Sequence, residues 1–129
     1  MSMSASEALS EAATAALRAV AGLTGVHEGR PVQAAAPYAL IEAGPELDWS
    51  HKSGVGRELR LAVIVRGKGE RPAPLRALAA EAEAAIEGLA GEIGGWRLVN
   101  LRFARGRLVA EARGEWAAVS EFRARMLKL

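Results

Sequence analysis

The stretch from Asp48 to Arg57 reads DWSHKSGVGR and contains residue types that could carry out hydrolysis. Asp48, Ser50 and His51 are the three residue types of a serine hydrolase triad, in which the His takes the Ser proton and the Asp orients the His. Triad members usually converge from separate segments of the chain, whereas these three lie within four residues. Successive side chains of an extended segment point to opposite sides, so Ser50 and His51 should diverge. We therefore interpret the stretch as a polar loop without catalytic function.

Two further kinds of site can be tested on the same stretch. Gly54-Val55-Gly56 lacks the third glycine of a dinucleotide fingerprint and the Gly-Lys-Ser/Thr of a phosphate loop, so we expect a turn there. His27 and His51 lie near carboxylates, but their separation does not resemble the spacing of metal ligands. The chain has no cysteine, which excludes disulfides and thiolate chemistry. We expect no catalytic residue, no cofactor and no bound metal.

Trp49 is the least ordinary residue of this stretch. A large aromatic side chain in a polar loop either packs over the local core or contacts a partner molecule, and the sequence leaves both interpretations open. The loop from Gly44 to Arg57 has about 14 residues, and loops of such length usually carry function. We expect it to reach a neighbouring molecule and to become ordered only on assembly.

Basic residues gather near the C-terminus. Residues 96–129 carry eight basic and three acidic side chains, whereas residues 1–95 carry nine and twelve, so the two parts have charges of +5 and −3. The candidate basic face consists of Arg97, Arg102, Arg105, Arg107 and Arg113. Interleaved with Trp96 and Phe103, these arginines could follow a nucleic-acid backbone, and a small nucleic-acid-binding module is the alternative function. They could equally be the solvated side of a strand, or a surface that attracts other copies of the chain.

Two helices should position these residues. Ser4 and Glu7 fit a capping box, and the apolar residues that follow share one helical face, which predicts a helix over about 6–21. A second apolar stripe begins after Pro74 and predicts a helix that ends near Gly88 or Gly91. No apolar run is long enough to cross a membrane, and the N-terminal residues do not resemble a signal peptide or an anchor.

Strands are predicted from short apolar runs and from alternation of apolar and polar residues. These patterns indicate strands over about 38–43, 58–66, 96–105 and 110–118, the last of which could extend toward Phe122. Gly106 predicts a tight hairpin turn at 105–107, and residues 123–129 read as an amphipathic tail. The predicted fold class is α+β, with two helices packed on one face of a mostly antiparallel four- to five-stranded sheet. A chain of 129 residues should form a single domain over 1–129, with flexible ends at 1–3 and about 124–129.

Several short motifs occur in an order that points to a family. Pro37-Tyr38-Ala39-Leu40-Ile41-Glu42-Ala43-Gly44 is followed by Asp48-Trp49-Ser50, then by Gly54-Val55-Gly56-Arg57-Glu58 and by an alternating strand. Gly95-Trp96-Arg97-Leu98-Val99 and a closing strand over 113–123 come after the second helix. This arrangement resembles the tail-completion or tail-terminator proteins of long-tailed bacteriophages and of phage-like gene transfer agents. The family has a first strand near Val26, although residues 25–37 of this chain are rich in alanine and poor in β-formers.

The resemblance implies a structural protein and no enzymatic activity. It implies a ring, sixfold in relatives, that ends the tail tube at its head-proximal side and joins it to the capsid connector or stopper protein. The partners would be other copies of the chain, the tail tube protein and the connector, while DNA passes through the channel without specific binding; no membrane is involved. Assembly would take place in the cytoplasm of the bacterial host. The subunit or tube interface would include Asp48, Trp49, His51, Lys52 and Arg57.

Overall fold

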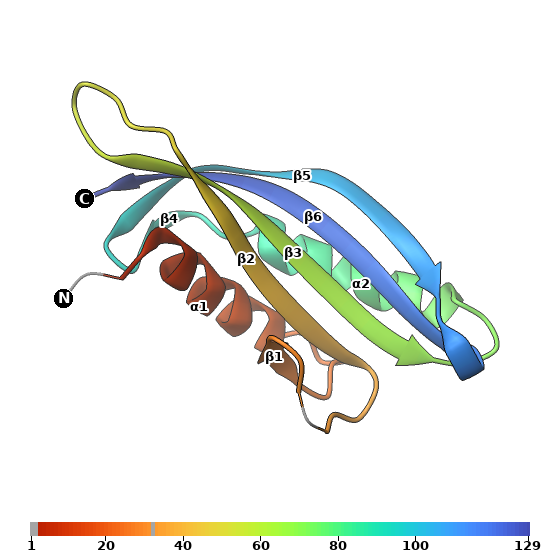
Figure 1. The fold of residues 1–129 in the computed structure, drawn as a ribbon. Coiled ribbons are helices and arrows are strands. Elements are labelled where there is room, and N and C mark those ends of the chain that lie inside the picture. The colour runs from red at the N-terminus through yellow and green to blue at the C-terminus, as the bar shows by residue number, and fades with distance from the viewer. Residues whose placement is uncertain (1–2, 32) are drawn as a thin grey trace.

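The computed structural model describes residues 3–31 and 33–129, and this part of the chain forms two α-helices and six β-strands (Figure 1). In chain order the elements are α1 (Ala5–Arg18), β1 (Val26–Glu28), β2 (Tyr38–Asp48), β3 (Gly56–Lys68), α2 (Ala73–Glu87), β4 (Gly91–Ile93), β5 (Trp96–Ala110) and β6 (Glu115–Lys128). A short 3₁₀ helix, Ala112–Gly114, connects β5 to β6. The predicted α+β class and the two helices are confirmed.

All described strands belong to one sheet with the order β1-β2-β3-β6-β5-β4. Four of the five neighbouring pairs are antiparallel, and β1 alone pairs in parallel with β2. The prediction of four to five strands was wrong, because β1 and β4 have only three residues each and so lack the alternation that reveals a strand. The resemblance nevertheless placed β1 correctly near Val26.

The helices follow the sequence prediction closely. Ser4 caps α1, since the backbone N–H of Glu7 donates to its hydroxyl at 3.1 Å. Helix α1 ends at Arg18, three residues before the predicted end, and α2 ends at Glu87 with Gly88 as its C-cap residue, as predicted. Among the described residues, neither helix is long and apolar enough to cross a membrane.

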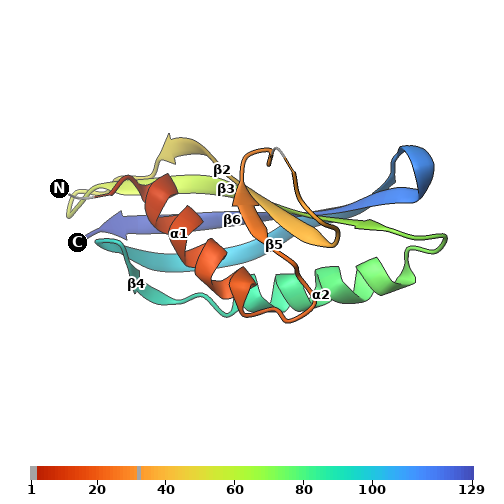
Figure 2. The same ribbon diagram turned by 90° about the horizontal axis from the view of Figure 1, so that it is seen from below.

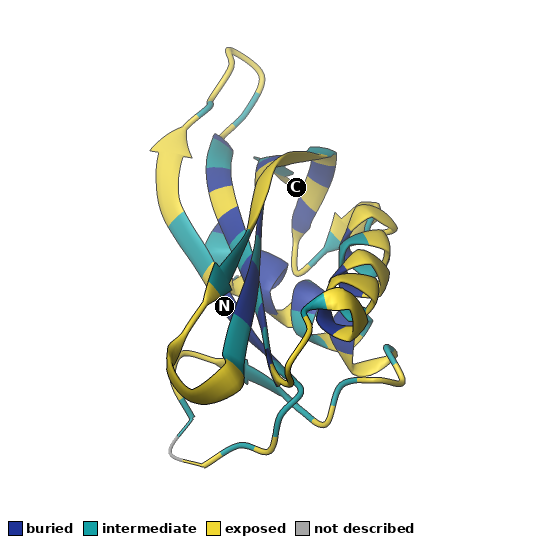
Figure 3. Ribbon diagram, turned by 90° about the vertical axis from the view of Figure 1, so that its right-hand side faces the viewer, coloured by how far each residue is buried: buried dark blue, intermediate teal, exposed yellow. Residues whose placement is uncertain are grey.

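The core cluster contains buried side chains of both helices and of alternate positions along the central strands. In Figure 2, α1 lies across the strands and α2 runs along one border of the sheet. Buried and less buried residues alternate along the central strands in Figure 3, as expected when one face is covered. The largest buried side chains include Leu9, Leu17, Leu61, Ile86 and Phe122. The other side of the sheet carries the alternate, less buried positions, such as Glu58, Arg60, Glu121 and Arg123, and we call it the helix-free face.

The predicted 14-residue loop from Gly44 to Arg57 was wrong. Strand β2 continues to Asp48 and β3 begins at Gly56, so the two form a long hairpin with a short tip. A register shift between Ala43 and Glu46, where Gly44 takes a φ of 126°, interrupts the alternation. This bulge explains why the sequence pattern ended too early.

The turn predicted at 105–107 was also wrong, since β5 runs through it to Ala110. Gly106 is a strand residue beneath Phe103, and a Cβ atom there would lie 3.1 Å from the Phe103 ring. The actual turn is formed by the 3₁₀ helix, in which Arg113 and Gly114 have φ values of 61° and 71°. The glycine therefore marks close packing in the strand, not a change of direction.

The flexible C-terminal end predicted at about 124–129 was wrong. Strand β6 extends to Lys128 and pairs with β3 on one side and β5 on the other. Ala124 and Met126 are fully buried. Of the predicted N-terminal end at 1–3, residues 1 and 2 lie outside the described part of the chain, and the carbonyl of Met3 accepts a hydrogen bond from the Trp96 indole at 3.0 Å.

Candidate functional site

The tip of the β2–β3 hairpin contains the residues that first suggested chemistry. Asp48 and Arg57 are register partners, and the N–H of Trp49 donates to the carbonyl of Gly56 at 2.9 Å. His51 and Gly54 exchange backbone hydrogen bonds of 2.9 and 3.1 Å, which close the tip. The hairpin extends beyond the rest of the sheet at one end of the molecule (Figure 1).

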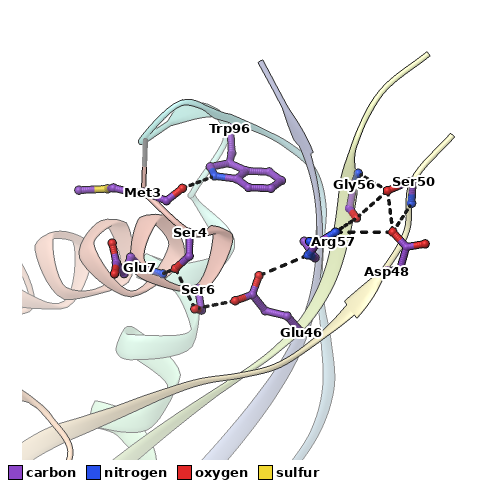
Figure 4. A network of polar contacts seen from close by, with 10 residues as sticks. All are labelled: Met3, Ser4, Ser6, Glu7, Glu46, Asp48, Ser50, Gly56, Arg57 and Trp96. Carbon is purple, nitrogen blue, oxygen red and sulfur yellow. Dashed lines mark hydrogen bonds and ion pairs between the residues drawn. The ribbon is translucent and has the colours of Figure 1, made fainter. Parts of the chain in front are cut away.

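Asp48 and Ser50 bond directly to each other (Figure 4). The Ser50 hydroxyl donates to Asp48 Oδ1 at 2.6 Å and also accepts the backbone N–H of Gly56 at 3.1 Å. The hydrogen bond from Ser50 is the main reason that the pKa of Asp48 lies below its ordinary value, and Arg57, 3.6 Å away, adds to the effect. A triad would need His51 between these two side chains, so the geometry is that of a structural turn.

The rings of Trp49 and His51 pack against each other. Their centroids lie 4.5 Å apart in an edge-to-face arrangement, and the guanidinium carbon of Arg125 lies 5.3 Å from the centroid of the Trp49 ring. Trp49 is half-buried and does not belong to the core cluster. Arg125 comes from β6, so Trp49 attaches the hairpin tip to the centre of the sheet.

A polar chain connects the hairpin to the start of α1 (Figure 4). Arg57 lies 3.9 Å from Glu46 Oε1, and the hydroxyl of Ser6 donates to the other oxygen of Glu46 at 2.9 Å. Arg57 therefore contacts both Glu46 and Asp48. These contacts give the hairpin a defined orientation relative to α1.

The structure thus brings together four of the five predicted interface residues in two contacts: Asp48 with Arg57, and Trp49 with His51. Lys52 is exposed at the tip. We expected this segment to become ordered only on assembly. In the single chain, backbone and side-chain hydrogen bonds already give it a defined structure.

The predicted basic face is distributed over one strand and one turn. Arg97, Arg102, Arg105 and Arg107 belong to β5, whereas Arg113 lies in the 3₁₀ turn. A register shift between Phe103 and Arg105 inserts one extra residue into β5. Because of this shift, Arg102, Arg105 and Arg107 all pair with β6 residues of the helix-free face. Arg105 forms an ion pair with Glu121 at 2.5 Å, which lowers the pKa of Glu121 and raises that of Arg105.

Four further arginines of this face were not included in the predicted basic face. They come from the two central strands and are Arg60, Arg66, Arg123 and Arg125. The alternation of Glu121, Arg123 and Arg125 with buried residues was the available signal, but the segment was interpreted as a tail. Glu58 lies 3.6 Å from Arg123 and 3.1 Å from Arg125, and Arg66 bonds Glu111 at 2.7 Å.

A hollow of about 620 Å³ crosses the helix-free face. Its lining comes from all four long strands and includes Glu42, Arg60, Arg105 and Glu121. A neighbouring hollow of about 350 Å³ shares Glu42 and Glu121 and adds Arg66 and Arg107. Both are open, charged surfaces, which suits contact with a macromolecule better than enclosure of a small ligand.

The two histidines lie apart. His27 is beside Leu40 in the register of β1 and β2, with its ring 5.9 Å from that of Tyr38, whereas His51 lies beyond the far end of β2. Within residues 3–31 and 33–129, no group of three or more His, Cys, Asp or Glu side chains is placed to hold a metal ion.

Comparisons with known proteins cover almost the whole chain. The model of one protein family, tail completion protein gp17, matches residues 9–127. A chain in the solved structure titled "Virion of native gene transfer agent (GTA) particle" is 28% identical, with a TM-score of 0.68. The match covers 95% of this chain and 94% of that chain. Among the curated proteins, no sequence matches.

Proposed function

The chain belongs to the family of tail completion protein gp17, as the sequence resemblance predicted, and from this membership we propose that it forms a ring at the head-proximal end of a tail tube. The ring stops growth of the tube and joins it to the capsid connector or stopper protein. It consists of six copies, and DNA passes through its centre without specific binding. Its role in the tail of a phage-like particle is structural and requires no catalytic residue.

The observation that carries this proposal is the extent of the match to a virion protein. The alignment includes 95% of this chain and 94% of the chain in the gene transfer agent particle, so the two share one complete domain. A single domain of this size must provide its contacts to neighbours from its own surface. A ring uses heterologous contacts, in which two different surfaces of each subunit meet.

The hairpin tip supplies one such surface. It extends beyond the sheet (Figure 1), and Lys52 and Val55 are exposed on it. We assign Asp48, Trp49, His51, Lys52 and Arg57 to the contact with the tail tube or with the adjacent subunit. The arginines of β5 belong to the second surface, which faces another subunit or the channel. Assembly takes place in the cytoplasm of the bacterial host.

Electron microscopy of the purified protein, alone and mixed with tail tubes, tests the ring directly. We expect rings at one end of each tube, and tubes that no longer elongate when more tube protein is added. Protein that leaves tube ends bare and tube growth unchanged would contradict the proposal.

Replacing Trp49 by Ala tests the hairpin tip. We expect the variant to remain folded, because Trp49 lies outside the core cluster, and to cap fewer tubes. Glu70→Ala is a control at the opposite end of the sheet, since Glu70 is exposed just after β3 ends at Lys68. Loss of the folded state in Trp49→Ala, with normal capping by the protein that remains folded, would instead assign Trp49 to stability alone.

A further inference from the structure

The sheet has two edges that its outer strands cover only in part. Strand β1 pairs with residues 39–41 of β2, and β4 pairs with residues 96–98 of β5. Within residues 3–31 and 33–129, residues 42–48 of β2 and 99–110 of β5 therefore have a neighbouring strand on one side only. We call these segments the β2 edge and the β5 edge. Uncovered edges are natural contact sites for another chain.

The two edges carry opposite charge. The β2 edge contains Glu42, Glu46 and Asp48 and no basic residue, whereas the β5 edge contains Arg102, Arg105 and Arg107 and no acidic residue. Each edge would repel a copy of itself, because like charges would then lie opposite each other. Each edge would attract the other, so the charges favour a contact between different edges of two molecules.

The register of the strands places the charges at the same level. Glu42 pairs with Ala62, Ala62 with Glu121, and Glu121 with Arg105. These four residues form one row across the sheet, which begins at the β2 edge with a carboxylate and ends at the β5 edge with a guanidinium. Arg102 and Arg107 lie on either side of Arg105 along β5.

Part of this charge is not neutralised within the chain. Glu46 and Asp48 share Arg57, and Arg105 bonds Glu121. Among the described residues, Glu42, Arg102 and Arg107 form no ion pair within 4.0 Å. The unmatched charges of the two edges are thus opposite in sign, and Arg102 and Arg107 each lie two rows from the level of Glu42.

We propose that the β2 edge of one copy lies against the β5 edge of the next copy. Glu42 then lies at the level of Arg105 of that next copy, with Arg102 and Arg107 on either side. This inference rests on the proposed ring. Strands β2 and β5 run in opposite directions, since three antiparallel pairs separate them. We place the strands along the ring axis; because the subunits of a closed ring stand at equal height, a row of one sheet then continues into the same row of the next.

The contact is made chiefly by side chains. Pro45 has no N–H to donate, and Gly44 departs from strand geometry, so the β2 edge cannot continue a long ladder of backbone hydrogen bonds. The same two residues prevent uncontrolled pairing with other strands. Charge therefore determines which edge is accepted.

Cysteine cross-linking tests the contact, because the chain has no cysteine of its own. Leu47 and Val99 have exposures of 57% and 43%. Leu47 lies in one row of the sheet with Glu58, Arg125 and Asn100. Val99 is adjacent to Asn100 in β5, so Leu47 and Val99 lie at the same level on the two edges. Leu47→Cys and Val99→Cys change no charge. We expect a short bismaleimide to link the two variants when they are mixed, and to link neither variant to itself.

Charge reversal provides the second measurement. Glu42→Arg in the Leu47→Cys background should reduce the cross-linking yield about two- to fivefold, the range expected for one exposed ion pair. Glu87→Arg makes the same change at an exposed site on α2 and should leave the yield unchanged. An unchanged yield in Glu42→Arg would overturn the role of this residue.

The outcomes separate this inference from the proposed function. Rings without a cross-link between the mixed variants, or a cross-link in Val99→Cys alone, would overturn the edge contact and leave the ring intact. Cross-linked open chains without rings would support the contact and overturn the ring. The absence of both rings and cross-links would overturn both.

Discussion

At the scale of single residues, Ser50 shows how a side chain that resembles a nucleophile is used for structure. Its hydroxyl donates to Asp48 and accepts the N–H of Gly56, so both of its hydrogen-bonding functions are occupied. The residue types of a triad are present. Because Asp48, Ser50 and His51 lie so close in sequence, they form a turn in which Asp48 bonds Ser50 directly and His51 does not lie between them. Sequence reasoning could reject the triad; it could not identify Arg125 as the partner of Trp49, because that contact joins residues 76 positions apart.

The titration of Asp48 should depend on Ser50. The hydrogen bond holds the pKa of Asp48 below its ordinary value of 3.8, so Ser50→Ala should raise that pKa toward 3.8. Because the folded state has the lower pKa, the stabilisation is complete above the ordinary value and is lost as the pH falls through the folded-state pKa. The stability difference between wild type and variant should therefore shrink in acid.

NMR titration of the Asp48 carboxyl, together with urea unfolding at neutral and acid pH, would measure both effects. Ser53→Ala, in the same exposed tip, is the matched control and should leave the titration unchanged. A titration of Asp48 that is identical in Ser50→Ala would show that the hydroxyl is not the cause of the shift.

At the scale of elements, the β2–β3 hairpin depends on one glycine. A Cβ atom at Gly56 would lie 2.2 Å from the carbonyl oxygen of Trp49, which is a backbone atom that cannot move without disrupting the tip. A Cβ atom at Gly54 would meet no atom of the described residues within 4 Å. The two glycines of Gly54-Val55-Gly56 thus differ in their tolerance of a side chain: position 56 has no room for a Cβ atom, whereas position 54 has room.

Gly56→Ala should lower the free energy of unfolding by about 1–3 kcal/mol, the usual range for overpacking. Gly54→Ala, two residues away in the same tip, should change it by about 0.5 kcal/mol or less. Urea unfolding of both variants would measure the difference. Equal effects would show that the approach of Trp49 to Gly56 relaxes easily.

The elements also show where sequence patterns are sufficient. Helix α2 was predictable because one apolar stripe, one early proline and one following glycine all agree on its position. Strand β2 was predicted too short because the register shift after Ala43 interrupts its pattern, and β5 was predicted too short because Gly106 was interpreted as a turn. The end of β6 was missed because Arg123 and Arg125 looked like a solvated tail, although they are the helix-free side of a central strand.

At the scale of the whole molecule, the +5 and −3 halves of the sequence do not form two separate poles. Strand β6, from the basic half, lies at the centre of the sheet and binds Glu58 of the acidic half through Arg123 and Arg125. Much of the basic excess is thus neutralised within the fold. What remains is the opposition between the β2 edge and the β5 edge, which no count along the sequence could reveal.

This neutralisation predicts weak binding to DNA. Of the arginines on the helix-free face and in the β5–β6 turn, five have no ion pair among the described residues, namely Arg60, Arg97, Arg102, Arg107 and Arg113, whereas Arg66, Arg105, Arg123 and Arg125 are paired with glutamates. Each phosphate contact contributes a slope of about −0.9 to the dependence of log K on log salt, so five free arginines give a slope of about −4.5 at most. Fluorescence anisotropy of labelled duplex DNA at several salt concentrations measures this slope, and an Arg102→Gln/Arg107→Gln variant is expected at about −2.7. A slope of about −6 or steeper would require the paired arginines to leave their glutamates for phosphate, and would favour the nucleic-acid-binding alternative over a channel through which DNA passes without being held.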